Sequence, residues 1–242
     1  MAGLLEVTGL ERQYRSSDGG FRLRIPHLTL KSGEILVIMG ESGSGKSTLL
    51  DMLALLAPPT VCDRFVLHAD GVKIDVGEAW RQGQRGQLAG WRARYMGYVL
   101  QTGGLLPYLT VRDNIALSRR LLGLTGNGPV PALAAASGIT EIMDRLPEQL
   151  SIGQRQRVAV VRALAHQPRL VLADEPTAAL DPARALALAK LLATVVAETG
   201  TALILVCHDL AVADQIGGRR LWCQSLTESG QPGSVVTSGH PS

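Results

Sequence analysis

The 242-residue sequence has no long apolar run, few aromatic residues and only three cysteines. No stretch of about eighteen apolar residues occurs, so no membrane-spanning helix is expected. Residues 1–11 lack the basic start and the long apolar segment of a secretory signal peptide. Cys62, Cys207 and Cys223 are widely spaced and form no Cys-x-x-Cys pattern, which argues against a disulfide framework or a zinc site. A reduced, cytoplasmic setting is therefore expected.

A strong excess of charge is also missing. The formal net charge is +3, and the arginines are scattered singly or in pairs, as is typical of solvated faces. We therefore expect no nucleic-acid partner. The length and the apolar content of 46% suit one large α/β domain, with or without a small inserted lobe.

The most informative stretch is 40–47, which reads Gly-Glu-Ser-Gly-Ser-Gly-Lys-Ser and matches in full the pattern Gly, four residues, Gly-Lys-Ser/Thr. An apolar run at 35–39 precedes it, and a leucine-rich stretch at 48–56 follows it, which predicts the strand, loop and helix that the motif requires. Its N–H groups and Lys46 would bind phosphates, and Ser47 would offer its hydroxyl to Mg²⁺. A glycine-rich turn with an incidental lysine is the alternative. We expect nucleotide contacts from Gly40, Glu41, Ser42, Gly43, Ser44, Gly45, Lys46, Ser47 and Thr48.

Polar side chains follow three of the predicted strands. Asp174 would hold Mg²⁺ directly or through water, and Glu175 would act as general base toward an attacking water. Two acids in a surface loop are the alternative. His208 would contact the γ-phosphate or orient the water, unless it is a structural histidine. The amide oxygen of Gln101 suits a weak Mg²⁺ or water ligand, although a lone glutamine indicates little by itself.

A second candidate anion site lies at 150–157, which reads Leu-Ser-Ile-Gly-Gln-Arg-Gln-Arg. It offers a hydroxyl, backbone amides and the start of a predicted helix. One domain needs only one triphosphate site, so a second would serve the nucleotide of a neighbouring subunit. A plain helix capped by Ser151 is the alternative.

Strands alternating with helices predict an α/β fold with a mostly parallel core sheet, an N-terminal antiparallel part and an inserted helical lobe at about 105–150. The polar, glycine-rich stretch 71–90 is expected to be a loop. Residues 1–232 are expected to form a single domain and 233–242 a loose tail. Strands are expected at 4–10, 21–30, 35–39, 64–68, 95–100, 170–173 and 201–206, a turn at 16–20, and helices at 48–56, 111–122, 154–166 and 181–197.

With these motifs in order, the sequence resembles the nucleotide-binding subunit of ABC transporters over essentially its whole length. The stretch 40–47 corresponds to the Walker A loop, 150–154 to the Leu-Ser-Gly-Gly-Gln signature, and 170–175 to Walker B with its catalytic glutamate. The resemblance implies the fold of P-loop NTPases. Single matches are Gln101 in the Q-loop, Asp181 in the D-loop, His208 as the switch histidine, and Tyr14 as the aromatic residue that stacks on adenine.

The resemblance also implies a mechanism. Two such subunits, identical or paralogous, would close head to tail on two ATP molecules. Each nucleotide would lie between the Walker A loop of one subunit and the signature of the other. The implied cofactors are ATP and Mg²⁺, with Glu175, His208 and Lys46 as catalytic residues, Ser47, Gln101 and Asp174 as metal ligands, and Tyr14, Gln101, Ser151, Gly153, Gln154 and Asp181 as further nucleotide contacts.

Gln101 and the stretch 105–114, Leu-Leu-Pro-Tyr-Leu-Thr-Val-Arg-Asp-Asn, are similar to the lipoprotein-release and macrolide-export branch. This branch implies a separate transmembrane permease and a peripheral position at the cytoplasmic face of the inner membrane. Cell-division ATPases and importers of amino acids or metal complexes share much of the stretch. A regulatory ATPase of a cell-envelope or division complex is therefore an alternative. A soluble ATPase acting on nucleic acid or ribosomes is disfavoured, because the sequence has no long coiled coil and no second cassette.

One residue departs from the family pattern. Ile152 occupies the position of the first glycine of the signature. A β-branched side chain restricts the backbone, although the main-chain N–H is retained. We expect ATP binding to persist, and we expect any effect to fall on the closed dimer.

Overall fold

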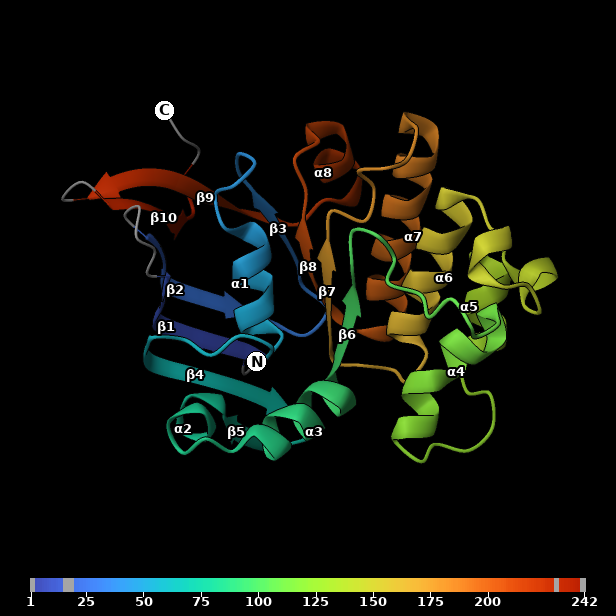
Figure 1. Cartoon of the computed structure of the whole chain (residues 1–242), viewed down its shortest axis with the longest axis horizontal. Coiled ribbons are helices and arrows are strands. Elements are labelled where there is room, and N and C mark those ends of the chain that lie inside the picture. Colours follow the sequence, from blue (N-terminus) through green and yellow to red (C-terminus); the bar gives the residue numbers. More distant parts are fainter. Residues whose placement is uncertain (1–2, 15–19, 229–230, 240–242) are drawn as a thin grey trace.

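A single mixed sheet forms the centre of the molecule (Figure 1). The computed structural model describes residues 3–14, 20–228 and 231–239. Within these residues the strands are β1 Leu5–Tyr14, β2 Phe21–Leu30, β3 Ile35–Met39, β4 Val61–Ala69, β5 Val72–Asp75, β6 Met96–Val99, β7 Leu170–Asp174, β8 Ala202–Val206, β9 Arg219–Glu228 and β10 Gln231–Thr237. They lie in the order β5-β4-β1-β2-β10-β9-β3-β8-β7-β6.

The two halves of this sheet differ in direction. Strands β9, β3, β8, β7 and β6 are parallel, whereas β1 pairs antiparallel with both β2 and β4. The predicted α/β fold, with a mostly parallel core and an N-terminal antiparallel part, is therefore confirmed. The expected turn at 16–20 lies mostly outside the described residues.

Helices cover both faces of the parallel strands. They are α1 Lys46–Leu53, α2 Val76–Arg81, α3 Arg85–Tyr95, α4 Val111–Leu121, α5 Val130–Ala136, α6 Ile152–Leu164, α7 Pro182–Thr199 and α8 Leu210–Ile216, with short 3-10 turns at Thr140–Ile142 and Pro147–Gln149. Successive residues of a strand point to opposite faces of the sheet and so pack in different hydrophobic cores. Ile204 packs in the cluster that contains α1, and Leu205 packs in the cluster that contains α6, α7 and α8. No helix in the described residues is both long enough and apolar enough to span a membrane.

The segment 231–237 corrects the expectation of a loose tail from residue 233. It forms β10, which lies between β2 and β9 and joins the two halves of the sheet. Its Ser, Gly and Pro content suggested a tail. However, Val236 is buried, and a Cβ at Gly233 would lie 2.6 Å from the carbonyl oxygen of Arg22. The glycine is therefore needed for close pairing with β2 and does not mark the end of the fold.

The segment 71–90 was expected to be a loop, which is wrong. It forms β5, α2 and most of α3. The carboxylate of Asp75 accepts a hydrogen bond from the N–H of Glu78 at 2.9 Å and so caps α2. The buried side chains of Val76 and Leu88 fasten both helices to the core. Because these contacts are tertiary, they outweigh the poor helix propensity of the glycines.

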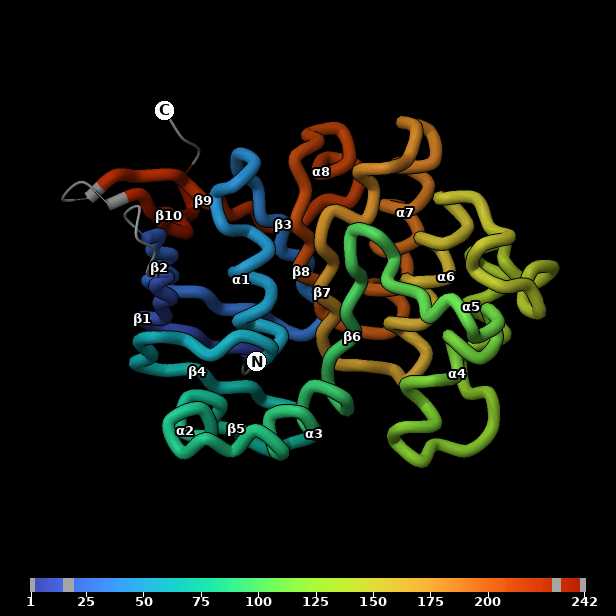
Figure 2. The backbone as a smooth tube through the Cα atoms, viewed as in Figure 1, coloured from blue at the N-terminus to red at the C-terminus, as the bar shows by residue number. Residues whose placement is uncertain are grey.

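A helical lobe follows β6, as the sequence predicts, and appears in green to yellow at one end of the tube in Figure 2. Its core joins Ile115 of α4 and Ala134 of α5 to Val158 and Val161 of α6. The opposite side of α6 packs in the cluster of the parallel strands, through residues such as Val160. Helix α6 therefore packs against both the lobe and the sheet.

Candidate functional site

The phosphate loop connects β3 to α1, as the sequence predicts. Gly45 precedes α1 with φ +89°, and a Cβ there would meet the ring of Phe21 at 3.1 Å. Gly40 lies so close to β9 that a Cβ would be 2.6 Å from the carbonyl oxygen of Cys223. These two positions therefore require glycine for both conformation and space. The first turn of α1 carries no acidic residue, which leaves the positive end of its dipole available to an anion.

Lys46 lies within this loop and is only 6% exposed. Its Nζ donates hydrogen bonds to the carbonyl oxygens of Gly40 at 3.0 Å and Glu41 at 2.6 Å. An ammonium group has three N–H donors, so one is left for a ligand. The side chain is therefore held in place at the floor of the loop.

A cleft of about 400 Å³ opens beside the loop. Such a volume is within the range of small-molecule sites. The cleft brings together the start of α1, the end of β6 and the end of β7. Its lining residues are Phe21, Ser42, Gly43, Gly45, Lys46, Ser47, Thr48, Gln101 and Glu175. All but Phe21 were named from the sequence, and only the pairing of β1 with β2 places that ring in the cleft.

The carboxylate of Asp174 lies behind the cleft at the end of β7. Burial raises its pKa, and the neighbouring carboxylates of Glu175 and Asp51 act in the same direction, whereas a hydrogen bond with the Ser47 side chain and the charge of Lys46 lower it. A half-buried carboxylate surrounded by other acids favours a cation beside it. Ser47 and Asp174 therefore offer an oxygen pair that fits Mg²⁺.

Tyr98 adds a polar contact that the sequence did not indicate. Its hydroxyl donates to Oδ1 of Asp51 at 3.1 Å, and burial is the main cause that raises the pKa of Tyr98. The phenol is consequently a neutral donor that fixes one acid of this group.

Glu175 and His208 are brought together by the ends of β7 and β8. His208 Nδ1 lies 3.4 Å from Oε2 of Glu175. The backbone of Glu175 has φ +43°, an uncommon conformation for a residue with a side chain, and its N–H donates to the carbonyl oxygen of Val206 at 3.1 Å. The Glu175 side chain is 21% exposed and that of His208 60%. The glutamate therefore reaches the cleft from a fixed position, and the histidine contacts it from the open side.

Gln101 lies in the cleft and follows β6. Its carbonyl oxygen accepts a hydrogen bond from the side chain of Gln156 on α6. Arg162, also on α6, donates to the carbonyl oxygens of Gly103 at 2.8 Å and Gly104 at 2.7 Å. Helix α6 therefore holds the loop that presents Gln101.

The second predicted anion site lies at the start of α6. Gln154 N–H donates to Ser151 Oγ at 3.3 Å, and Ser151 N–H donates to Gln154 Oε1 at 2.9 Å, which is a capping box. The N–H groups of Ile152 and Gly153 have no acceptor among the described residues. Ser151, Gly153 and Gln154 do not line the cleft. Within one chain, the start of α6 therefore lies outside the cleft.

Asp181 is also outside the cleft. Its carboxylate accepts from the N–H of Arg184 at 3.0 Å and caps α7, as the sequence predicts. A Cβ at Gly153 would lie 3.5 Å from the side chain of Leu180. The turn before α7 thus packs against the start of α6 within one chain.

Tyr14 is not among the residues that line this cleft, and the adenine contact expected of it stays a prediction. It is 42% exposed, and the guanidinium carbon of Arg12 lies 4.8 Å from its ring centre. Phe21 is its partner across the β1–β2 pair. The aromatic wall of the cleft is therefore Phe21.

Comparisons with known proteins agree with this geometry. The family model described as ABC transporter matches residues 23–178. The chain is 35% identical over 240 residues to a methionine import ATP-binding protein, MetN, of Cupriavidus metallidurans, covering 98% of the chain and 65% of that protein. It is 35% identical over 222 residues to a lipoprotein-releasing system ATP-binding protein, LolD, of Idiomarina loihiensis, covering 88% of the chain and 91% of that protein.

Solved structures extend the likeness to three dimensions. The dimeric post-hydrolysis structure of the ATP-binding cassette MJ0796 bound to ADP and Pi has a TM-score of 0.71 and 29% identity, covering 90% of this chain and 93% of that one. CbiO1 from Clostridium perfringens, described as part of the transporter complex cbiONQ, has a TM-score of 0.75 and 26% identity, covering 96% of this chain and 87% of that one.

Proposed function

This chain belongs to the ABC transporter family, and we propose that it drives a separate transmembrane permease as one of a head-to-tail pair of ATP-hydrolysing subunits. It is an ATPase of the P-loop type. The observation that carries the proposal is the cleft, because it joins Lys46, Gln101 and Glu175 from three separate elements around one phosphate loop.

Within the cleft, each residue has a distinct chemical role. Glu175 is the general base that polarises the attacking water, since its carboxylate reaches the cleft from an anchored backbone. His208 orients that carboxylate through Nδ1 and presents Nε2 to the γ-phosphate. Lys46 and the loop N–H groups stabilise the charge on the transferred phosphoryl group.

Ser47, Asp174 and Gln101 would hold Mg²⁺ between the phosphates and the sheet. The hydrogen bond between Ser47 and Asp174, together with the raised pKa of the Asp174 carboxylate, supports this donor set. A bound Mg²⁺ would neutralise the negative charge of the phosphates.

The pairing of subunits rests on the separation of the two anion sites. The free N–H groups of Ile152 and Gly153 lie at the start of α6, away from the cleft of their own chain. In a head-to-tail pair this end of α6, with Ser151, Gln154 and the nearby Asp181, would cover the nucleotide of the other subunit. The dimeric structures of a similar cassette support that arrangement.

A second concave surface suits the permease. A groove of about 240 Å³ lies between α3, β6, α4 and α6 and includes Tyr98, Leu117, Leu121 and Arg162. Leu121 is 73% exposed beside the partly apolar lining of this groove, so its side chain is available to a partner. We assign this groove to an apolar segment of the permease, which would hold the subunit at the cytoplasmic face of the membrane.

We further propose that the transporter is of the lipoprotein-release or export type. A lipoprotein-releasing system protein, LolD, is among the relatives of this chain, at 35% identity over 222 residues. The stretch 105–114 supports the same branch. The permease recovered with the chain decides between release and import.

The Glu175→Gln variant tests the mechanism. It should lose steady-state ATP hydrolysis, keep ATP binding and form an ATP-dependent dimer, because the amide removes the base and leaves the phosphate contacts intact. Glu198→Gln makes the same chemical change on the exposed end of α7 and serves as the control. Hydrolysis by the Glu175 variant at the parent rate would refute the assignment of the base.

Affinity purification of the tagged chain from detergent-solubilised membranes of its host tests the partner. A stoichiometric membrane protein with several spans is the expected result, and its sequence identifies the type of transporter. Recovery with a cell-division complex that lacks transport would indicate a regulatory ATPase instead. Recovery only from the soluble fraction with ribosomes or DNA would contradict the transporter function.

A further inference from the structure

The lobe contains a third concave surface. This lobe pocket has a volume of about 570 Å³ and lies between α4, α5 and the connection 122–129. It shares no lining residue with the nucleotide cleft or with the groove assigned to the permease. Helix α4 separates the two lobe surfaces, since Leu117 and Leu121 face the groove whereas Ala116 and Arg119 face the pocket.

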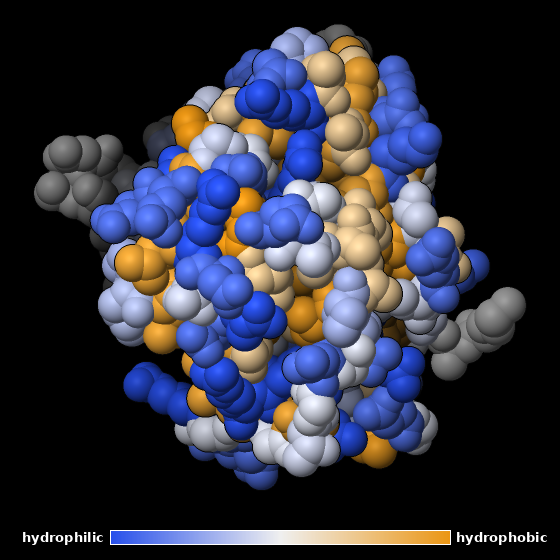
Figure 3. All heavy atoms as spheres, turned by 90° about the vertical axis from the view of Figure 1, so that its right-hand side faces the viewer, coloured by the Kyte–Doolittle hydropathy of each residue, from blue (hydrophilic) through white to orange (hydrophobic). Residues whose placement is uncertain are grey.

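The lining of the lobe pocket is cationic and otherwise mostly apolar. Its three charged residues are Arg112, Arg119 and Arg120, and no acidic residue lines it. Apolar lining comes mainly from Ala116, Leu124, Val130, Ala134 and Met143. The space-filling view of this end of the molecule shows a band of apolar surface with hydrophilic side chains on both sides (Figure 3).

Arg119 places a buried positive charge in the pocket. The residue is 8% exposed, and its guanidinium donates only to main-chain carbonyl oxygens, those of Ala165 at 3.1 Å, Thr125 at 3.0 Å and Gly126 at 3.3 Å. No described carboxylate forms an ion pair with it, and each terminal nitrogen keeps a second N–H without an acceptor among the described residues. A buried cation of this kind gains from an anion beside it.

The glycine at 128 shows that the loop is built around this guanidinium. Gly128 has φ +51°, and a Cβ there would lie 2.4 Å from Nη1 of Arg119. Any side chain would therefore displace the arginine or the loop. The charge is consequently fixed in position at the pocket wall.

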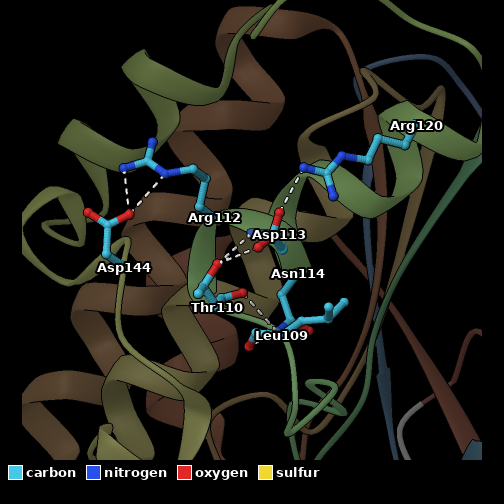
Figure 4. A network of polar contacts seen from close by, with 7 residues as sticks. All are labelled: Leu109, Thr110, Arg112, Asp113, Asn114, Arg120 and Asp144. Carbon is cyan, nitrogen blue, oxygen red and sulfur yellow. Dashed lines mark hydrogen bonds and ion pairs between the residues drawn. The ribbon is translucent and has the colours of Figure 1, made fainter.

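The other two arginines, Arg112 and Arg120, also line the pocket, and the ion pairs that they form now contribute little to stability. Arg112 pairs with Asp144 at 2.9 Å, and Arg120 pairs with Asp113 at 2.7 Å (Figure 4). Both arginine side chains are more than half exposed, and the Asp144 side chain is 83% exposed. Exposed ion pairs contribute little, so either arginine can turn to a ligand at small cost.

We propose that the lobe pocket binds a small amphiphilic organic anion, with its carboxylate at the arginines and its apolar body against α4 and α5. The charge of the lining selects an anion, and the apolar wall selects a ligand with a hydrocarbon part. The volume of about 570 Å³ is that of a small-molecule site, which disfavours a protein segment as occupant.

Calorimetric titration of the full chain with octanoate tests the proposal. Octanoate should bind saturably, whereas octylammonium, with the opposite charge, and acetate, without the apolar body, should not. Arg112→Gln combined with Arg120→Gln should weaken octanoate binding by about tenfold, since two charge-assisted contacts are lost. Asp144→Asn should strengthen it, because Arg112 is released.

A substitution that fills the lobe pocket provides an independent test of the proposed binding site. Ala116→Leu should abolish octanoate binding, whereas Ala187→Leu, the same change on an exposed position of α7, should leave it unchanged. Both variants should retain the far-UV circular dichroism spectrum of the parent. The proposal is overturned by absence of saturable octanoate binding, by equal binding of octylammonium, or by full binding in the Ala116 variant.

Discussion

The close packing of β6 on α6 predicts that Gly97→Ala will destabilise the whole protein. Gly97 is buried in β6, and a Cβ there would lie 2.2 Å from the carbonyl oxygen of Ala163 in α6. Ordinary contact begins at 3.4 Å, so the strand and the helix must separate by about 1.2 Å. Because the obstacle is main chain, no side-chain rotation can relieve it.

The expected cost is near the upper end of overpacking substitutions. These typically cost about 1–3 kcal/mol, and the rigid neighbour at Gly97 favours a value of about 3 kcal/mol. This corresponds to a roughly hundredfold change in the unfolding equilibrium. The measurement is urea unfolding followed by far-UV circular dichroism, with the linear dependence on urea extrapolated to water.

A second glycine provides the matched control. Gly90 lies in the helix α3, and a Cβ there would meet no atom within 4 Å. Gly90→Ala should therefore stabilise the protein by about 0.5–1 kcal/mol, the usual gain in a helix. The two substitutions are chemically identical and should have opposite signs. A Gly97 variant within about 0.5 kcal/mol of the parent would refute the packing argument.

The Gly97→Ala substitution should also affect the nucleotide site. Gln101 follows β6 by two residues, and α6 holds its loop through Gln156 and Arg162. Separation of β6 from α6 should therefore lower ATP hydrolysis in the fraction that remains folded. ATP affinity should change less, because the phosphate loop at 40–47 lies on another strand.

Two further substitutions follow from the charges and caps of the site. Asp174→Asn should abolish hydrolysis and raise the melting temperature at neutral pH. The melting temperature should rise because burial raises the pKa of Asp174 in the folded state, so that ionisation of this carboxyl group opposes folding. The gain should disappear as the pH falls below the ordinary value of 3.8, and a constant gain at all pH values would contradict this cause. Asp181→Ala should cost about 1 kcal/mol in urea unfolding by removing the cap of α7, whereas Asp181→Asn should retain most of it; equal losses would exclude the cap.

Features that depend on neighbours in sequence could be predicted. The strand, loop and helix around 40–47 and the caps at Ser151 and Asp181 are present as expected. Each depends on hydrogen bonds or conformations within about four residues, and the residue types state them directly. The residues that follow β6 and β7 also reached one cleft, because the carboxyl ends of parallel strands meet at one edge.

Features that depend on residues far away in the sequence could not be predicted. The segment 71–90 contains five glycines, yet burial of Val76 and Leu88 makes most of it helical. Strand β10 exists only because β2 and β9 pair with it from both sides. The aromatic side of the nucleotide cleft also depends on contacts between distant parts of the chain. Phe21 is the cross-strand partner of Tyr14, and its presence in the cleft depends on how β2 packs beside the phosphate loop, which the sequence did not indicate.

The departure at Ile152 can be judged from the geometry of α6. The residue begins the helix, so its β-branched side chain is in a conformation that it tolerates, and it is 49% exposed. The capping box uses the N–H groups of Ser151 and Gln154, and leaves those of Ile152 and Gly153 free. The donors that an anion would meet belong to the backbone and do not depend on a glycine. The substitution therefore changes the shape of the surface at the start of α6, where a second subunit would approach, and leaves the free backbone N–H groups in place.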